Sequence, residues 1–451
     1  MATYKTPGVY VEEISKLPPS VAEVSTAVPA FIGCTANGPT VDKKGKVVPV
    51  VQRIDTLLDF ETLFGGPNAS AFTVPAGVNV SQPGAISRDA PAFDYLLYYS
   101  ISLYFKNGGG SCYVVSIGDY SAAPVKSQFE AGLAALEKED EPTLILLTDA
   151  INLAATDYYD LAQQTLAQCA KLGDRFAILD VIDAKGVDDF RMNIGANNLM
   201  YGAAYYPSVR TTLVYVYQEN QVTLKTADPA GTDTKLDASK ATNTALYNQV
   251  KAALAQQRIT LPSSSAVAGV YASVDRDRGV WKAPANIGLS SIIGPTLKIT
   301  AQDQENLNID PTAGKSINAI RAFTGKGTLV WGARTLAGND NEWRYVSVRR
   351  LFNMIEESTQ KATSFAVFEP NDASTWLKVK AMIESFLYGL WQQGALAGPT
   401  SDDAYFVNVG LGKTMTPQDV LEGRLIVEIG VAAVRPAEFI ILRFMHKLQQ
   451  A

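Results

Sequence analysis

Histidine is almost absent from this 451-residue sequence, in which His446 is the only one. One imidazole leaves only one possible Ser-His-Asp arrangement, and it excludes a two-histidine metal site and an HExxH helix, which need two imidazoles. The three cysteines, Cys34, Cys112 and Cys169, are far apart and form no CxxC pair. This spacing favours buried thiols in a reducing cytoplasm over disulfides or zinc. We therefore expect no catalytic, metal-binding or cofactor-binding residue.

Excess positive charge and long apolar runs are also missing. The formal net charge is −6, so nucleic acid is not an expected partner. No window of about eighteen apolar residues without charges occurs, so we expect no membrane insertion. Residues 1–8 lack the charged and then apolar pattern of a secretory signal, and export by that route is not expected. The length suits two or three domains, each with its own core.

Strands and helices alternate through the middle of the chain. Amphipathic spacing predicts helices around Leu133 and over 158–172. Apolar, β-branched runs predict strands at 28–33, 111–117, 143–147 and 176–182. Apolar strands separated by helices indicate a mainly parallel sheet that is covered by helices.

Three aspartates follow these strands, at the sheet edge where enzymes of this architecture often carry their site: Asp149, Asp180 and Asp183. No GxSxG elbow, GxGxxG loop or histidine accompanies them. We interpret the aspartates as helix caps and solvated edges. An Asp/Ser hydrolase on this domain is the alternative, and a surface-layer or adhesin-type binding module is a third reading.

Two glycine-containing stretches look like phosphate loops but lack essential parts. The run 107–110 (NGGG) is not followed by a helix with Lys-Ser/Thr. The run 311–316 (PTAGKS) has Ile309 where the first glycine of a Walker A motif belongs. We predict a structural turn at both places.

The last third of the chain predicts a hairpin (317–323 with 328–332), two amphipathic helices and two strands (405–409 and 425–429). The helices are expected over 343–361 and over 376–392, the second with a Ser374 cap. Four charged residues on the first helix predict a solvated or inter-subunit pairing face: Arg349, Arg350, Glu356 and Glu357.

A further strand is predicted at 439–444, close to the C-terminal end of the sequence. Its residues alternate, with Ile440, Leu442 and Phe444 on one face and Phe439, Ile441 and Arg443 on the other. An apolar strand with unpaired backbone groups is costly and adhesive. It therefore either closes a sheet of its own domain or joins the sheet of a neighbouring copy.

Short motifs distributed through the whole chain give a family resemblance. They are TPGVYVEE (6–13), FIG (31–33), LFGG (63–66), NGG (107–109) with CYVV (112–115), GVWKAPAN (279–286), VWGARTL (330–336), RRL (349–351) with IE (355–356), and GRLI (423–426) with PAEFI (436–440). In this order they resemble the contractile tail sheath family of myophages, pyocins and extracellular contractile injection systems.

The resemblance implies an α/β and α+β multidomain fold with a subtilisin-like α/β sheet domain in the middle. The implied division is an N-terminal β arm, an N-terminal part of the sheath core, the α/β domain, a C-terminal α+β domain and a C-terminal β arm, over 1–25, 26–118, 119–265, 266–430 and 431–451. The middle segment contains no histidine, so it cannot run a Ser-His-Asp mechanism. Flexible joints are expected at Gly8 and over 430–435.

The implied function is a structural subunit that stacks in hexameric, helical rings around an inner tube and contracts to drive the tube through a target envelope. Its implied partners are neighbouring sheath subunits or sheath paralogues, the inner tube, the baseplate and terminal cap proteins. Assembly would take place in the bacterial cytoplasm. A phage tail for DNA delivery is the alternative to an injection-system or pyocin-like particle, and the compact length favours the latter.

The resemblance assigns assembly roles to three groups of residues. Both arms would add a β-strand to a neighbour. The N-terminal arm would use Val9, Tyr10, Val11, Glu12 and Ile14, and the C-terminal arm Phe439, Ile440, Ile441, Leu442, Arg443 and Phe444. Lys378, Lys380 and Glu384, on the predicted helix over 376–392, are candidates for a tube-facing or inter-subunit surface.

Overall fold

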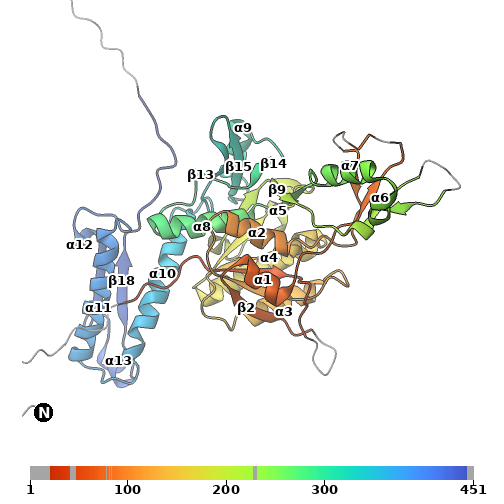
Figure 1. Cartoon of the computed structure of the whole chain (residues 1–451). Helices are drawn as coiled ribbons and strands as arrows, with labels where there is room; N and C mark the ends of the chain where they lie inside the picture. The colour runs from red at the N-terminus through yellow and green to blue at the C-terminus, as the bar shows by residue number, and fades with distance from the viewer. Residues whose placement is uncertain are drawn as a thin grey trace, which may run out of the picture. The chain divides into compact units, whose positions relative to one another are not determined.

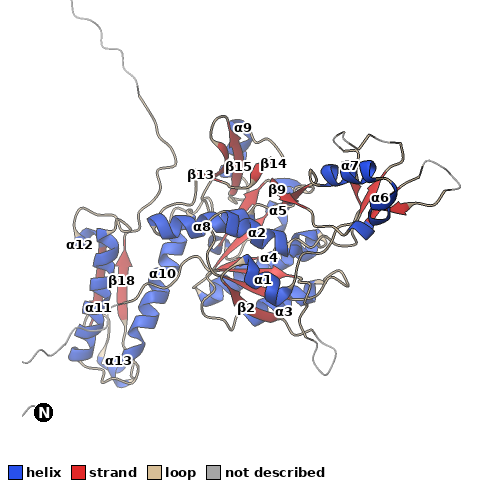
Figure 2. Ribbon diagram, viewed as in Figure 1, coloured by secondary structure: helices blue, strands red, loops and turns tan. Residues whose placement is uncertain are grey.

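Thirteen α-helices and eighteen β-strands form the described part of the chain in a computed structural model (Figure 1; Figure 2). The structure describes residues 21–40, 47–77, 79–80, 82, 84–226 and 231–443. The chain divides into two units. The larger contains Ser25–Met354 and the segment from Arg435 onward, and the smaller contains Ile355–Val434 and residues up to Val24. The architecture is a mixed α/β multidomain fold with several separate sheets.

A nine-stranded sheet is the centre of the larger unit, in the order β13-β16-β15-β8-β7-β6-β1-β5-β2. The six strands from β15 to β5 run parallel, and β2, β13 and β16 are antiparallel to their neighbours. The prediction of a mainly parallel sheet is confirmed. The strands are β1 (Pro29–Gly33), β2 (Val50–Ile54), β5 (Cys112–Ser116), β6 (Leu144–Leu146), β7 (Phe176–Asp180), β8 (Gly202–Tyr206), β13 (Ile287–Gly288), β15 (Ile317–Phe323) and β16 (Gly327–Trp331).

Helices cover both faces of this sheet because its central strands are apolar on both sides. Successive residues of a strand point to opposite faces. Phe31 accordingly belongs to one hydrophobic core, whereas its neighbours Ala30 and Ile32 belong to a second one. Helices α2 and α8 supply the first core and α3, α4 and α5 the second. The helices of the larger unit's body are α1 (Leu57–Phe64), α2 (Leu97–Lys106), α3 (Lys126–Leu136), α4 (Ala155–Leu172), α5 (Gly186–Asn193), α8 (Ser264–Arg278) and α9 (Ala301–Asn308).

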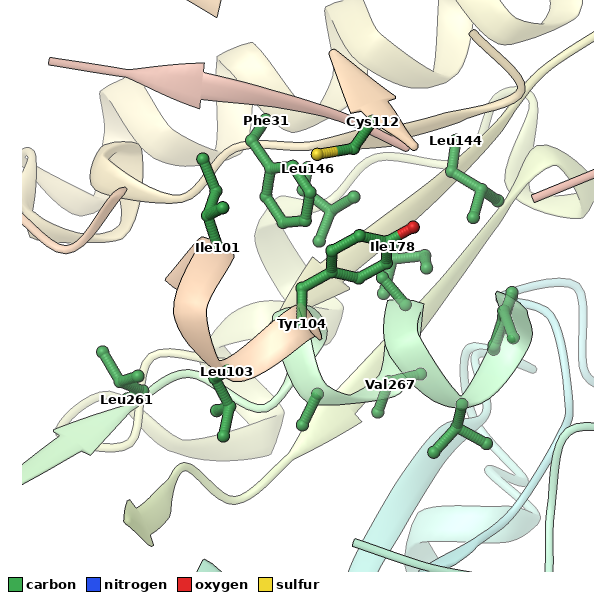
Figure 3. Packing of buried hydrophobic residues seen from close by; sticks show 14 of the residues in the cluster. Phe31, Ile101, Leu103, Tyr104, Cys112, Leu144, Leu146, Ile178, Leu261 and Val267 are labelled. Atoms are coloured by element: carbon green, nitrogen blue, oxygen red, sulfur yellow. The ribbon is translucent and has the colours of Figure 1, made fainter. Parts of the chain in front are cut away.

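Figure 3 shows the first core, in which side chains of the sheet meet two helices. Phe31, Leu146 and Ile178 come from three neighbouring strands, and Tyr104 comes from α2. The Phe31 and Tyr104 rings meet edge to face with their centroids 5.2 Å apart, a geometry that aromatic pairs prefer. Val267 of α8 closes the layer, so segments far apart in sequence share one core.

The sheet crosses the boundaries that the sequence analysis places at 118/119 and 265/266. Strands β1, β2 and β5 come from the segment 26–118, β6, β7 and β8 from 119–265, and β13, β15 and β16 from 266–430. Pairing between parallel strands far apart in sequence leaves no local signal, because neighbours are chosen by the tertiary fold. The nine-stranded sheet therefore unites strands from three of the implied segments.

Two smaller sheets complete the larger unit. One has the order β12-β9-β14 and is antiparallel, and the other, β11-β10-β3-β4, has its own core with α6 and α7 around Phe72, Leu236 and Val250. The elements are β3 (Phe72–Val74), β4 (Ser87–Arg88), β9 (Val209–Val214), β10 (Val222–Leu224), β11 (Thr234–Lys235), β12 (Arg258–Leu261), β14 (Ile292–Pro295), α6 (Leu236–Thr242) and α7 (Thr244–Leu254).

The smaller unit contains helices and a two-stranded antiparallel ribbon. Helix α10 begins in the larger unit and ends in this one. The elements are α10 (Val346–Thr363), α11 (Ala373–Gln392), α12 (Ser401–Ala404), β17 (Tyr405–Val409), α13 (Pro417–Leu421) and β18 (Val427–Val431). The predicted Ser374 cap is wrong. The Asp372 carboxylate accepts the Thr375 N–H at 3.0 Å, so the helix begins one residue before Ser374.

Asp149, one of the three aspartates that follow strands, is buried, so its interpretation as a solvated edge is wrong. It accepts three backbone N–H groups, from Cys34 at 2.7 Å, Leu96 at 2.6 Å and Leu97 at 3.0 Å. Burial raises its pKa to about 7, and the three N–H groups oppose this rise. The carboxyl ties the end of β1 to the start of α2, which is the capping role that the sequence predicts.

Asp180 is also buried and accepts the Ser264 N–H, the first of α8, at 2.9 Å. Asp183 accepts the Ser208 N–H at 3.1 Å and the Thr296 hydroxyl at 2.7 Å. Burial raises the pKa of Asp180 to about 7, against the effect of its hydrogen bonds from Ser264. These carboxyl groups join elements of the fold.

Both glycine-containing stretches form turns. Helix α2 ends at Lys106, and the chain turns through 107–110 into β5. In the second stretch, the Asp310 carboxylate accepts the N–H groups of Thr312, Ala313 and Lys315 at 3.1 to 3.2 Å. This local carboxylate occupies backbone donors that a phosphate would need, so the predicted structural turn is confirmed.

The described residues contain neither a candidate metal site nor a candidate membrane-spanning helix. Within them, no group of three histidine, cysteine or acidic side chains is arranged to hold a metal ion. None of the helices in the same residues combines the length and the apolar character that crossing a bilayer requires.

Asp180→Asn tests the buried carboxyl. The folded protein keeps a proton up to about pH 7, whereas the unfolded chain releases it near pH 4. Through this group, wild-type stability therefore falls as pH rises between these values. Asn does not titrate, so the free energy of unfolding of the variant minus that of wild type should rise by about 1 kcal/mol per pH unit in this window. Urea denaturation at several pH values measures it.

Asp277→Asn is the matched control, because Asp277 is exposed and forms a surface ion pair with its neighbour Arg276. Its difference from wild type should stay nearly flat over the same range. A difference for Asp180→Asn that stays constant or falls with pH would contradict the prediction.

Candidate assembly interface

The chain leaves β18 through residues that are hydrogen-bonded on both sides. Ala432 donates its N–H to the Ala404 carbonyl at 2.8 Å and accepts the Ala397 N–H at 2.7 Å. Val434 donates to the Ala395 carbonyl at 3.2 Å. The expected flexible joint over 430–435 is therefore wrong for its first five residues, because β18 and these bonds hold them in the smaller unit.

Glu438 is held on the larger unit, four residues after the last of these bonds. Arg334 donates to the carboxylate from Nε at 2.9 Å and from Nη2 at 2.6 Å. Asn308 donates at 2.7 Å and the Tyr345 hydroxyl at 3.2 Å. The Arg334 side chain is 4% exposed and that of Glu438 22%. A two-point, largely buried Arg–carboxylate pair fixes both position and orientation.

Arg334 is itself rigidly placed. The Asn318 side chain accepts the Arg334 N–H and donates to its carbonyl, both at 2.8 Å. Arg334 Nη1 donates to the carbonyls of Asn308 at 3.2 Å and Gly338 at 3.4 Å. Asn308 is the last residue of α9, so the guanidinium also faces the negative end of a helix. The arginine is thus oriented by the fold, whether or not Glu438 is present.

The pKa of Glu438 reflects this pairing. Burial by itself would raise the pKa, but the hydrogen bonds from Arg334, Asn308 and Tyr345 outweigh it and leave the pKa below its usual range. The carboxylate is therefore ionised and paired at neutral pH. We refer below to Glu438 with Arg334, Asn308 and Tyr345 as the Glu438 anchor.

An apolar run follows the Glu438 anchor and lies open to solvent. Phe439 is 66% exposed, Ile440 80%, Ile441 78% and Leu442 72%. The described residues of this run, 439–443, form no strand, and Phe444 and His446 lie outside the described residues. Closure of a sheet within the same chain, one of the two alternatives for this segment, is absent from the residues 439–443. Four adjacent, exposed apolar side chains form an adhesive surface.

The ribbon of β17 and β18 offers edges for such a segment. Five residue pairs join the strands, from Tyr405 with Val431 to Val409 with Val427. Val407 and Val409 are buried, and β17 packs against α11. In the described residues no third strand pairs with β17 or β18. Since a two-stranded ribbon is only marginally stable alone, added strands would stabilise it.

Helix α11 carries the three charged residues that the sequence analysis singles out. Its apolar stripe, including Val379, Ile383 and Leu387, is buried. Lys378 is exposed, and Lys380 and Glu384 are half-buried and pair with each other at 3.4 Å. Beside them the exposed Leu377 and Tyr388 extend the outward face. The residues of the N-terminal arm, Val9, Tyr10, Val11, Glu12 and Ile14, lie outside the described residues.

The expected charged face of α10 is wrong for its two arginines, which are buried. The Arg350 guanidinium pairs with Asp275 at 2.5 and 3.0 Å and donates to the Thr26 carbonyl at 2.7 Å. Arg349 lies 4.3 Å from the Trp343 ring centroid and donates to Asn353 at 2.7 Å. The charges are placed inside the fold because each guanidinium has partners there.

Glu357 on the same helix is also buried, and it pairs with Lys361 at 2.7 Å. Glu356 is exposed. The predicted face therefore holds for Glu356 alone. Sequence periodicity could not separate these cases, because the partners of Arg350, Thr26 and Asp275, are far away along the chain.

Full-length comparison with solved structures gives the family. A chain in the cryo-EM structure of the anti-feeding prophage baseplate is 31% identical, with 99% of this chain and 100% of that chain covered and a TM-score of 0.68. A chain of the PVC sheath complex, an extracellular contractile injection system in the contracted state, is 33% identical, with 99% of each chain covered and a TM-score of 0.67. The chain belongs to the contractile tail sheath family. This family is structural and not enzymatic.

Sequence relatives agree with this placement. The family model "Phage tail sheath C-terminal domain" matches residues 338–446. The tail sheath protein of Vibrio phage KVP40 is 25% identical over 186 residues, which are 41% of this sheath chain and 26% of the phage protein. A putative prophage major tail sheath protein of Pseudomonas aeruginosa is 27% identical over 140 residues, 30% of this chain and 34% of that protein. The matches thus span about a quarter to a third of these relatives.

The Glu438 anchor is the part of this sheath surface that sequence reasoning missed. Both charges stand inside motifs that carry the resemblance, Arg334 in VWGARTL and Glu438 in PAEFI. A single charge within each apolar run was the available signal, because a charge among buried residues needs a partner. Their separation of 104 residues hid the pairing.

Arg350→Ala tests whether α10 is held by its buried ion pair. The Arg350 and Asp275 side chains are 3% and 6% exposed, so the variant leaves a buried carboxylate without its cation. Removing one partner of such a pair destabilises a protein by about 3–5 kcal/mol. Urea denaturation of the unassembled chain measures the loss. Arg276→Ala, which removes an exposed pair with Asp277, should cost about 0–1 kcal/mol. Equal costs would contradict a structural role for the buried pair.

Proposed function

We propose that this chain is a sheath subunit that polymerises into stacked hexameric, helical rings around an inner tube and contracts from a metastable extended state, driving the tube through a target envelope. The observation that supports it most is the exposed apolar run after the Glu438 anchor, in a chain that matches sheath chains over its full length. A PVC relative is described as a sheath complex in the contracted state.

Strand donation is the proposed means of polymerisation. In it, the residues from Phe439 onward add to an edge of the β17–β18 ribbon of a neighbouring copy. Backbone hydrogen bonds would supply affinity, and alternating side chains would supply specificity. Donor and acceptor are different surfaces of the same chain, which gives a heterologous contact. Such contacts build open helical filaments from one protein.

The expected free energies indicate that the binding of one donated strand is only marginally favourable by itself. Burying a large apolar side chain contributes about 1.5–3 kcal/mol, and ordering a backbone residue costs about 1–2 kcal/mol. For four apolar side chains on five ordered residues the two effects nearly cancel. Polymerisation therefore depends on several weak contacts for each copy, which makes the assembly cooperative.

The two terminal arms and the fold of the central sheet complete the proposal. We include the N-terminal arm, residues 1–25, as a second donated segment with Val9, Tyr10, Val11, Glu12 and Ile14 as its contact residues, and 431–451 as the C-terminal arm. The central α/β sheet is proposed to be subtilisin-like in fold without the protease chemistry. Asp149 and Asp180 support the absence of that chemistry, because both are buried and accept backbone N–H groups.

Contraction is proposed as rigid-body movement of whole subunits while the arms keep neighbours connected. The free energy would come from the difference between two packings of the same subunits. The sheet with its two cores and buried ion pairs is suited to remain rigid. The segment from Arg435 to Ala437 lies between the hydrogen bond of Val434 to Ala395 and the Glu438 anchor. It is the short link that would change direction.

The proposed partners are neighbouring copies or sheath paralogues, the inner tube, the baseplate and terminal cap proteins, with assembly in the bacterial cytoplasm. An injection-system particle is favoured over a phage tail for DNA delivery. Full-length likeness at 31% and 33% identity joins this chain to the anti-feeding prophage and PVC chains, whereas the Vibrio phage match covers 41% of it.

Truncation after Glu438 tests polymerisation by strand donation. The deleted residues make no strand in the described part of the chain, so the variant should fold with wild-type circular dichroism. It should form no long sheaths, because the donor strand is missing. Negative-stain microscopy of the expressed wild-type chain should show long striated hollow cylinders.

Two further variants sharpen this test. Ile440→Ser with Leu442→Ser keeps the length but removes apolar burial on one face, and it should also prevent assembly. Asp237→Asn changes an exposed residue of α6, outside the proposed donor and acceptor, and it should assemble normally. Long sheaths from the truncated chain would contradict strand donation.

The outward face of α11 is proposed as a contact with the inner tube, through Lys378, Lys380 and Glu384. Lys378→Glu with Lys380→Glu should weaken co-assembly with the tube while the subunit stays folded. A like-charge pair with Glu384 costs only about 0.2–0.5 kcal/mol on a helix. Co-sedimentation with the tube protein measures it. Lys185→Glu with Lys240→Glu, two exposed lysines elsewhere, is the control. Unchanged tube binding by the α11 variant would count against this contact.

A further inference from the structure

The residue directly before the apolar run is the most firmly held residue of the C-terminal segment. Glu438 receives hydrogen bonds from Arg334, Asn308 and Tyr345. Phe439, the next residue, is 66% exposed. The change from fixed to free thus occurs between two adjacent residues. A simple flexible tail would not need a buried two-point ion pair at this position.

We propose that Glu438 is a positioning residue that sets the register of the donated strand: by fixing residue 438 on its own subunit, the anchor makes Phe439 the first residue of the strand that enters the neighbouring copy. This inference rests on the proposed strand donation and goes beyond it by naming what selects one register among several.

Register needs such a device because the run itself specifies it weakly. Side chains alternate between the two faces of a strand, so a slip of one residue exchanges the whole set. Both sets here are apolar at first, Phe439 and Ile441 against Ile440 and Leu442, and only Arg443 marks one face as polar. The run by itself therefore prefers one facing only through Arg443, whose charge is costly to turn toward an apolar surface. A fixed position of residue 438 leaves one register for the donated strand.

The rigidity of the anchor is sufficient for this role. Arg334 is locked by Asn318 on its main chain and by the end of α9 on its guanidinium. Each further residue of extended chain advances about 3.3 Å. Since the position of residue 438 is defined on its own subunit, the position and facing of residues 439–443 follow by counting. Once a subunit is in place, the Glu438 anchor therefore fixes the register in which its strand pairs with the neighbouring copy.

Insertions between Glu438 and Phe439 test the proposal without changing anything before residue 439. One inserted Ser shifts the run by a residue and exchanges its faces, and Ser-Thr shifts it by two and restores them. With Glu438 intact, the one-residue insertion should assemble at least about tenfold less than the two-residue insertion, which corresponds to a difference of about 1.4 kcal/mol per contact. The readout is the sedimenting fraction, with sheath length from negative-stain images.

The same insertions in a Glu438→Ala background should assemble equally well, because a released chain can slide to a favourable register. Glu342→Ala, which removes an exposed glutamate outside the β17–β18 ribbon and the Glu438 anchor, is the matched control and should keep the tenfold difference. In hydrogen-exchange measurements, the backbone amides near residues 435–438 should exchange faster in Glu438→Ala than in wild type, and the control variant should show no such change.

The outcomes separate this inference from the proposed function. If truncation after Glu438 abolishes assembly but the one-residue and two-residue insertions assemble alike with Glu438 intact, strand donation stands and register setting is overturned. The same is true if the tenfold difference persists in Glu438→Ala. If the truncated chain still forms sheaths, strand donation itself fails.

Discussion

Burial of apolar side chains on both faces of one parallel sheet is the constraint on which the larger unit depends. Residues such as Ala30, Phe31 and Ile32 are fully buried, so neither face can be left to solvent. Helices must therefore cover both sides, and they come from distant parts of the sequence. The result is a body that resists internal rearrangement, because close-packed cores do not deform continuously. A subunit that moves as a rigid body requires this property.

Buried polar groups serve the same rigidity. Asp149 and Asp180 join strand ends to helix starts, and Arg350 with Asp275 holds the beginning of α10. Each would be costly without its partner, so each fixes one arrangement of the elements around it. Acidic residues at the ends of parallel strands suggest catalysis in many enzymes. Here their oxygens are occupied by the backbone of the protein itself, which is consistent with membership of a structural family.

The proposed assembly contacts lie where burial within one chain is incomplete. The ribbon of β17 and β18 and the run from Phe439 to Leu442 are two places where backbone pairing or apolar burial is incomplete within the described residues of one chain. The Glu438 anchor adjoins the second of them. A rigid body with incomplete edges is a natural unit for a polymer, since the missing contacts are made by other copies and their number grows with the assembly.

The sequence by itself determined the family, the mainly parallel α/β architecture, the presence of the helices α10 and α11 to within a few residues, and the apolar character of the C-terminal run. These properties follow from local periodicity and from motifs, which are read residue by residue. Only the tertiary structure decided that one sheet unites strands from Pro29 to Trp331, that Arg349 and Arg350 are buried, and that Arg334 holds Glu438. Those outcomes depend on partners far along the chain, and local patterns carry no information on which distant residue a strand or a charge will meet.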